Sequence, residues 1–161
     1  QPRQPRRIPG ATVAPIQENR PLIAINLHPA ERTPTETVEA FLAALAALDM
    51  DGARALMADN IVYQNVPFPA DHGAAATTKT LKKFLVPFRS FEVETLNIAA
   101  NGNTVLTERI DTFANGKYRA GFWVCGTFEV EDSKITLWRD RFDLVDMGFN
   151  LVRGLLRAPF R

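Results

Sequence analysis

The sequence predicts an α+β fold, in which N-terminal helices pack on the concave face of a curved, mostly antiparallel β-sheet. Two observations support this prediction. Apolar residues repeat at helical spacing in the first half of the chain, and strand-like segments joined by two Asn-Gly turns fill most of the second half. Helices followed by a meander of strands are typical of α+β domains. A sheet curved around helices leaves a hollow that can hold a small apolar ligand.

The first helix is expected to begin in the stretch TPTE at residues 33–36. Thr33 can cap the helix, Pro34 suits its first position, and Glu36 completes a capping box. Apolar residues then recur at helical spacing, which predicts a helix that continues to about Leu48. They are Val38, Phe41, Leu42, Leu45 and Leu48.

Three further helices are expected. Asp51 can cap a short second helix, and Thr77 or Thr78 can open a third helix, which Pro87 ends. The apolar residues of 145–157 fit a C-terminal helix that carries arginines on its opposite side. Three roles stay open for this last helix: it lies on a membrane surface, closes the cavity, or forms a dimer contact.

Five segments are interpreted as β-strands, because they are rich in β-branched and aromatic residues. Asn101-Gly102 and Asn115-Gly116 are strong hairpin signals between them. Gly121 and Gly126 suggest bends or bulges within the longest strand. The expected strands are Ile61–Val66, Phe91–Ala99, Thr104–Phe113, Tyr118–Val130 and Ile135–Leu144.

The composition narrows the possible functions. The chain has 161 residues, enough for one domain at 32–161 behind a proline- and arginine-rich arm at 1–31. Because the arginine excess lies in the arm, the domain is not expected to bind nucleic acid, and no apolar run is long enough for a membrane span. The single cysteine, Cys125, is expected to be buried and fits a cytoplasmic location. No metal site built from imidazoles is expected, since the two histidines lie far apart, and the acid-base chemistry described below requires no metal or other cofactor.

The last strand, LWRDRFDL at 137–144, carries a charge among apolar residues. Side chains alternate between the two faces of a strand, so Asp140 shares its face with apolar neighbours. Those neighbours are Trp138, Phe142 and Leu144. The opposite face carries charges that we interpret as a solvated ladder, namely Arg139, Arg141 and Asp143.

Two other strands repeat this pattern. Arg109 and Asp111 share a face with apolar residues in TVLTERIDTF (104–113), and Tyr63 and Asn65 share a face in IVYQNV. If the three faces line one cavity, the arginine can bind both carboxylates in a fork geometry. One protonated and one ionised carboxyl can then act together as acid and base, while the tyrosine and the asparagine hold a water molecule.

A structural alternative stays open for each of these residues. Charges on neighbouring strands often form a ladder on a solvated face, and an asparagine before a proline turn is common. Asp140 is the strongest single candidate, because a solvated face would leave Trp138 and Phe142 exposed to water. His72 stands in a polar segment and is expected to be an ordinary surface residue.

Three segments, taken together and in order, closely resemble the limonene-1,2-epoxide hydrolase family. They are YQNVPFP (63–69), TERIDTF (107–113) and ITLWRDRFDL (135–144). The resemblance covers about residues 33–145, and FWVCGTFEV looks closest to actinobacterial, mycobacterial-type members. It implies a cone-shaped mixed sheet of the cystatin-like, nuclear transport factor superfamily. It also implies a homodimer formed through the sheet, and a cofactor-free reaction that opens an epoxide in one step to a vicinal diol.

The same resemblance implies a role for each residue of the site. Asp140 would be the general base on water, and Tyr63 with Asn65 would orient that water. Asp111 would donate a proton to the epoxide oxygen. Arg109 would bridge the two carboxylates and could also bind the epoxide. The candidates to line a pocket for a small apolar substrate are Phe68, Leu81, Phe84, Leu85, Trp138 and Phe142.

One position departs from the family pattern, which usually has Tyr where this chain has Arg141. Alternation points Arg141 away from the pocket, so we expect its effect on the surface or a dimer contact. Two other functions remain as alternatives. One is an isomerase or cyclase related to ketosteroid isomerase, and the other is a non-catalytic module that binds an apolar ligand.

Overall fold

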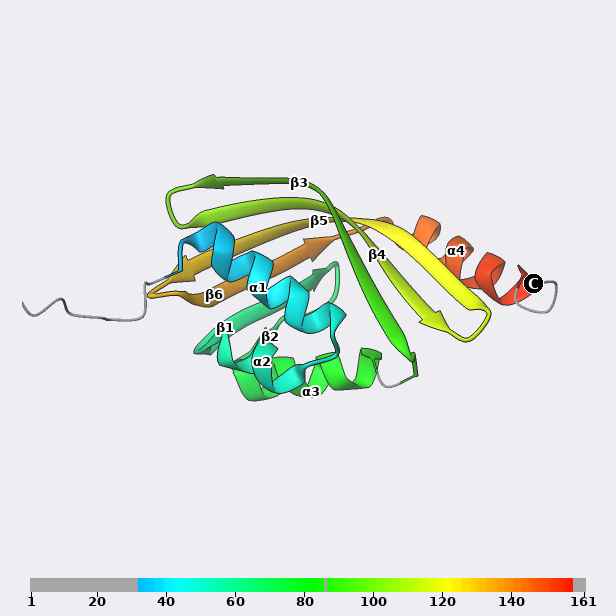
Figure 1. The fold of residues 1–161 in the computed structure, drawn as a ribbon, viewed down its shortest axis with the longest axis horizontal. Coiled ribbons are helices and arrows are strands. Elements are labelled where there is room, and N and C mark those ends of the chain that lie inside the picture. The colour runs from blue at the N-terminus through cyan, green and yellow to red at the C-terminus, as the bar shows by residue number, and fades with distance from the viewer. Residues whose placement is uncertain (1–31, 86, 158–161) are drawn as a thin grey trace, which may run out of the picture.

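A single β-sheet organises the described part of the chain. The structure is a computed structural model that describes residues 32–85 and 87–157. Six strands form one open sheet in the order β2-β1-β6-β5-β4-β3, and only β1 and β6 run parallel (Figure 1). The strands are β1 (Met57–Val66), β2 (Asp71–His72), β3 (Ser90–Asn101), β4 (Thr104–Asn115), β5 (Tyr118–Glu131) and β6 (Lys134–Arg141). The predicted α+β class is confirmed, whereas the arm at 1–31 lies outside the described residues.

Four helices accompany the sheet, and Figure 1 shows α1 lying across one face of it. They are α1 (Pro34–Ala46), α2 (Met50–Ala55), α3 (Ala74–Leu85) and α4 (Leu144–Arg157). The predicted capping box at Thr33 and Glu36 is present at the beginning of α1. Within the described parts of the chain, no helix is both long enough and apolar enough to cross a membrane.

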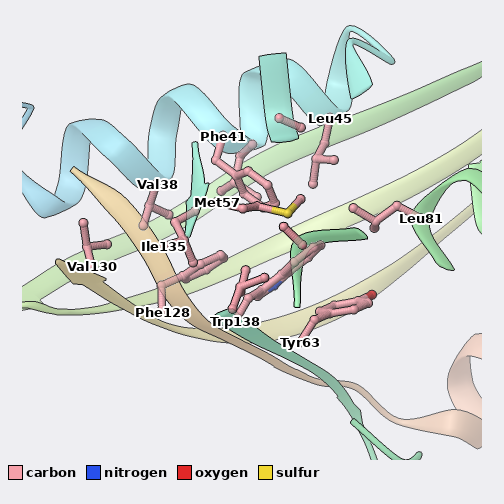
Figure 2. Close-up of a cluster of buried hydrophobic side chains, with 14 of the residues drawn as sticks. Val38, Phe41, Leu45, Met57, Tyr63, Leu81, Phe128, Val130, Ile135 and Trp138 are labelled. Carbon is pink, nitrogen blue, oxygen red and sulfur yellow. The ribbon is translucent and has the colours of Figure 1, made fainter. Parts of the chain in front are cut away.

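The core lies between α1 and the sheet (Figure 2). Phe41 of α1 contacts Trp138 of β6 edge to face, with ring centroids 5.0 Å apart. Trp138 in turn lies against Tyr63 of β1, at 4.2 Å between centroids. Such contacts hold both aromatic rings in one orientation. The polar edges of Trp138 and Tyr63, which belong to the site described below, are therefore held in place by the core.

Several boundaries differ from the sequence-based expectation. Asp49, and not Asp51, caps α2, because its side chain accepts a hydrogen bond from the Gly52 amide at 2.9 Å. α3 begins at Ala74, earlier than the predicted threonines, and β1 begins at Met57. The short strand β2 was not predicted; it contains His72, which is exposed as expected.

The end of β6 is the largest of these differences. The strand ends at Arg141 and does not reach Leu144. Asp143 accepts hydrogen bonds from the amides of Val145 and Asp146, at 2.8 and 3.1 Å, so it caps α4. The interpretation of Asp143 as part of a strand ladder was therefore wrong, and Leu144 is an exposed helix residue.

The convex side of the sheet, away from α1, gives two further results. Arg141 is exposed there, and neither it nor Arg139 forms an ion pair within the described residues, so these two arginines are not members of a charge ladder. Cys125 is only partly buried on this side, which corrects the expectation of a buried cysteine.

Candidate active site

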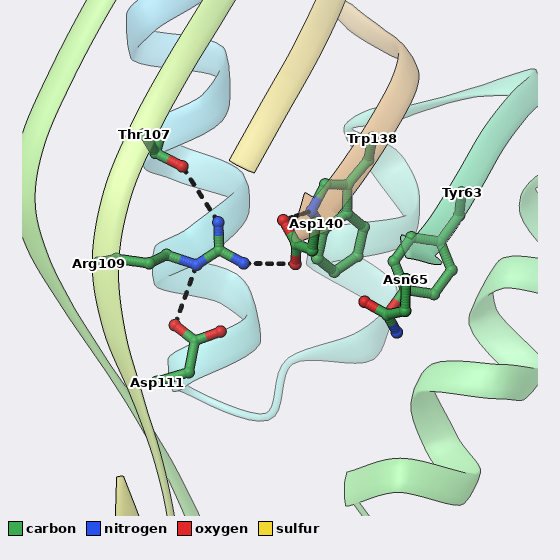
Figure 3. Close-up of polar contacts among 7 residues, drawn as sticks. All are labelled: Tyr63, Asn65, Thr107, Arg109, Asp111, Trp138 and Asp140. Atoms are coloured by element: carbon green, nitrogen blue, oxygen red, sulfur yellow. Dashed lines mark hydrogen bonds and ion pairs between the residues drawn. The ribbon is translucent and has the colours of Figure 1, made fainter. Parts of the chain in front are cut away.

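A buried arginine joins two buried carboxylates on the concave side of the sheet (Figure 3). Arg109 of β4 donates from Nε to Asp111 Oδ1 at 2.9 Å, and from Nη2 to Asp140 Oδ2 of β6. The exposed fractions are 1% for Arg109, 6% for Asp111 and 4% for Asp140. The alternative of a charge ladder on a solvated face is wrong for these three residues.

The guanidinium of Arg109 crosses β5 to reach Asp140, and Gly126 lies at the crossing. Gly126 is paired with Thr107 on β4 and with Asp140 on β6. A Cβ atom at this position would collide with Arg109 Nη1 and Thr107 Oγ1. Of the bend or bulge expected at Gly126, the bulge is absent from the pairing with β4, since the β4–β5 register runs unbroken from Thr104 to Asn115. The glycine instead leaves room for the arginine.

Thr107 is a member of the site to which the sequence pattern gave no role. It is buried, and its hydroxyl accepts a hydrogen bond from Arg109 Nη1 at 3.1 Å. Arg109 thus has three side-chain acceptors, which fix the orientation of its planar guanidinium. Alternation placed Thr107 on the correct face of β4, but a threonine among apolar residues carries no functional signal by itself.

The parallel pairing of β1 with β6 brings the predicted tyrosine and asparagine to the carboxylates. Asn65 is paired with Asp140, and Tyr63 is paired with Trp138. Asn65 Nδ2 donates to the Tyr63 hydroxyl at 2.5 Å, and Trp138 Nε1 donates to Asp140 Oδ1 at 2.8 Å. Figure 3 shows Asn65 and Asp140 pointing into the same space from neighbouring strands.

Burial and charge shift the protonation equilibria of the site in a consistent way. Burial raises the pKa of Asp111 to about 6 and raises the pKa of Asp140, while Arg109 opposes both shifts. For Arg109, burial alone would lower the pKa, but Asp140 and Asp111 together raise it, so the guanidinium stays charged. Burial raises the pKa of Tyr63 above its usual range, and the charge of Asp140 adds to this effect, so the phenol stays neutral.

One guanidinium cannot balance two ionised carboxylates in a buried site, so one proton shared by the pair is favoured. Asp140 accepts hydrogen bonds from two N–H groups, of Arg109 and Trp138, whereas Asp111 accepts one from Arg109. Hydrogen bonds donated to a carboxylate favour its ionised form. The geometry therefore favours the negative charge on Asp140 and the proton on Asp111.

A cavity of about 170 Å³ opens beside these groups. Asp111, Asp140, Tyr63 and Asn65 are its polar lining, and the remaining wall is apolar. Arg109 is not among the lining residues, because it lies behind the two carboxylates. The arrangement can therefore protonate one atom of an apolar ligand and activate a water molecule for attack on a neighbouring atom.

All six residues named from the sequence as pocket-lining candidates border this cavity, although their contact with a substrate stays a prediction. Phe68 and Phe84 are exposed at its rim. Six further residues that line the cavity were not predicted as pocket residues: Leu45, Phe91, Phe113, Phe122, Val124 and Met147. Alternation along β4 and β5 could have indicated three of them, whereas Met147 comes from α4, whose position no local pattern specifies.

Within residues 32–85 and 87–157, no group of three or more histidine, cysteine, aspartate or glutamate side chains could hold a metal ion.

Comparison with known proteins gives a family match, a similar protein sequence and a similar solved structure. A profile of the limonene-1,2-epoxide hydrolase catalytic domain matches residues 32–153. Over 119 residues the chain is 47% identical to epoxide hydrolase EphG of Mycobacterium tuberculosis, which covers 74% of this chain and 79% of EphG. The solved structure of an M. tuberculosis LEH-like epoxide hydrolase aligns with a TM-score of 0.72 at 44% identity, covering 79% of this chain and 95% of that one.

More distant structures share the fold. An NTF2-like protein of unknown function from Cytophaga hutchinsonii aligns with a TM-score of 0.59 at 20% identity, covering 71% of this chain and 94% of its own. A protein with a ketosteroid isomerase-like fold from Catenulispora acidiphila aligns with a TM-score of 0.66 at 15% identity, covering 74% and 95%. At such low identity these similarities establish the fold alone.

Proposed function

The chain belongs to the limonene-1,2-epoxide hydrolase family, and from that premise we propose that it adds water to the epoxide of an apolar substrate in one step, without a cofactor, to give a vicinal diol. One observation supports the assignment of the reacting groups. Two buried carboxylates share one arginine at the polar end of an apolar cavity, beside a hydrogen-bonded Asn–Tyr pair.

The step uses both carboxyl groups at once. Asp140 takes a proton from a water molecule, and the water oxygen forms a bond to one epoxide carbon. The bond from that carbon to the epoxide oxygen breaks, and its electron pair stays on the oxygen. Asp111 gives its proton to this oxygen. Asn65 and Tyr63 hold the water, because both border the cavity beside Asp140.

Arg109 acts as a positioning residue in this proposal. It holds Asp111 and Asp140 by hydrogen bonds from two different nitrogens, Nε and Nη2, and does not border the cavity. Its charge stabilises whichever carboxylate is ionised, before and after the step. After turnover Asp140 carries the proton and Asp111 the charge, so the proton must return to Asp111 before the next cycle.

The alternative of an isomerase or cyclase explains less of the site. Moving a proton on a ketone needs one acid or base, so the second carboxylate and the water-holding pair would be superfluous. A non-catalytic binding module would gain nothing from burying three charged groups, whose desolvation is costly. The epoxide hydrolase proposal uses all five residues.

The cavity wall supports an apolar substrate. We expect Trp138 and Phe142 on the sheet side, and Phe68, Leu81, Phe84 and Leu85 at the loop and α3, to contact its hydrocarbon part. Incubation of the purified chain with terpene, styrene-type, cyclic and fatty epoxides tests the proposal. At least one of them should give a vicinal diol faster than buffer alone. Ketone isomerisation without any diol would contradict the proposal.

We further propose a cytoplasmic homodimer formed through the convex side of the sheet. Support for the dimer comes from Leu106 and Trp123, which are exposed on β4 and β5 at the outward positions of the sheet, and the lone cysteine fits a reducing compartment. Replacing Trp123 by Glu would place a charge in that contact. Light scattering should give a dimer mass for the native chain and a monomer mass for Trp123→Glu. A native chain of monomer mass would contradict the dimer.

A further inference from the structure

A second cavity of about 160 Å³ lies next to the first, between the segment that joins β1 to β2 and helix α3. Four residues line both cavities: Tyr63, Asn65, Phe68 and Phe84. Asp71 of β2 and Thr80 of α3 line only the second cavity. The water-holding pair of the site thus stands at the boundary between the substrate cavity and the second cavity.

The second cavity is suited to hold water. At about 30 Å³ for each molecule of liquid water, it has room for several. A buried water needs two to four polar partners, and polar side chains are present along this space. Tyr63 is buried, whereas Asn65, Asp71 and Thr80 are partly exposed, so the space connects the buried Tyr63 with the surface.

The hydrogen bonds of the site also support a water molecule in the second cavity. Asn65 Nδ2 donates to the Tyr63 oxygen, so the hydroxyl proton of Tyr63 remains for another acceptor. Asp71 is the β2 partner of Tyr63 in the antiparallel pairing, and paired residues project to the same face of a sheet. A water in the second cavity can therefore bridge the Tyr63 hydroxyl to the Asp71 carboxylate.

The reaction needs a route for water that the substrate does not close. Each turnover of the proposed hydrolysis consumes one water. An apolar epoxide that fills the first cavity separates Asp140 from solvent on that side, since the wall there is apolar. A water that enters from behind Tyr63 and Asn65 reaches the same two residues without passing the substrate.

We propose that the second cavity is the entrance for the hydrolytic water, which passes Thr80 and Asp71 to reach Asn65 and Tyr63 while the epoxide occupies the first cavity. This inference rests on the proposed function. Thr80 and Asp71 are positioning residues in it, because neither borders the substrate cavity.

Thr80→Leu tests the route by filling it with an apolar side chain. The kcat should fall about tenfold, because the leucine slows the entry of water. The KM should change little, because the substrate cavity is unaltered. Substrate inhibition should also appear. An epoxide that binds before water then forms an unproductive complex, which a merely structural defect would not produce. The solvent deuterium isotope effect on kcat should fall toward unity, since water entry replaces proton transfer as the slow step.

Two variants serve as controls. Thr80→Ser keeps the hydroxyl and the space, so it should behave as the native chain. Thr78→Leu makes the same chemical change two residues earlier on α3, at a side chain that lines neither cavity, and should leave kcat and the hyperbolic substrate curve unchanged.

The outcomes separate the two levels of the proposal. Native chain that makes no diol overturns the proposed function, and this inference with it. Native activity with an unchanged Thr80→Leu variant overturns the water route alone. If Thr80→Leu does not fold, the variants Thr80→Val and Asp71→Leu decide, because neither new side chain can form a hydrogen bond to water. Each should lower kcat about two- to threefold by removing one water partner, and full activity in both would overturn the inference.

Discussion

Replacing Asp140 by Asn is expected to lower kcat roughly 10²–10⁴-fold, the usual contribution of a general base. An amide of the same size cannot take the proton from water, but its oxygen can still accept the hydrogen bond of Arg109, and only the hydrogen bond of Trp138 to the other oxygen is lost. The chain should therefore stay folded while diol formation is lost. Initial rates with an accepted epoxide, together with a thermal unfolding curve, measure the two effects separately.

Asp143→Asn is the matched control, because it makes the same change three residues later at an exposed helix cap. Asparagine caps helices as well as aspartate, so this variant should keep native activity and stability. Asp111→Asn should also lose turnover, since an amide cannot protonate the epoxide oxygen. An Asp140→Asn variant that retained most of its activity would show that another group activates the water.

Replacing Arg109 by Met is expected to lower the free energy of unfolding by about 3–5 kcal/mol near neutral pH. The change leaves two carboxyl groups buried beside each other without their shared cation. The cost arises from the charge that remains, and much less from packing, because the methionine fills most of the same space. Urea unfolding of the native chain and the variant measures this loss.

The loss of unfolding free energy in Arg109→Met should depend on pH, and the pKa shifts determine the direction of this dependence. Burial raises the pKa values of Asp111, to about 6, and of Asp140 in the folded chain, above the ordinary value of 3.8, and removal of Arg109 raises both further. A carboxyl group whose folded pKa exceeds its unfolded pKa destabilises the fold as pH rises through the folded value. The loss of unfolding free energy caused by Arg109→Met should therefore be small near pH 4 and largest above about pH 7.

A triple variant tests whether charge is the cause. Arg109→Met combined with Asp111→Asn and Asp140→Asn removes the whole charged group, and it should recover part of the stability lost by Arg109→Met alone at neutral pH. A deficit that was equal at acid and neutral pH, and equal in the single and triple variants, would indicate lost packing instead.

Much of the site could be predicted from the sequence because β-strand alternation is a local property. Alternation placed Asp140 with Trp138, and Arg109 with Asp111, on faces that the structure shows to be buried. The capping box of Thr33 and Glu36 is likewise formed by residues that are close in sequence. These features need no knowledge of what the strand packs against.

Other features depended on contacts between distant segments. Gly126 was interpreted as a bend or bulge, but its role follows from the Arg109 side chain that crosses it from the next strand. Asp143 continued the alternation of β6, yet the chain turns there, and the carboxylate caps α4 instead. The pairing of β2 with β1, which brings Asp71 opposite Tyr63, had no signal in a two-residue strand.

The central claim is that water attacks the epoxide directly, with Asp140 as its base. A single turnover in ¹⁸O-labelled water, with enzyme in excess over epoxide, tests this claim most directly. Mass spectrometry should find one ¹⁸O atom in the diol and none in the peptide that contains Asp140. Unlabelled diol, with ¹⁸O in that peptide, would contradict the account, because the carboxylate itself would then have attacked and formed a covalent ester.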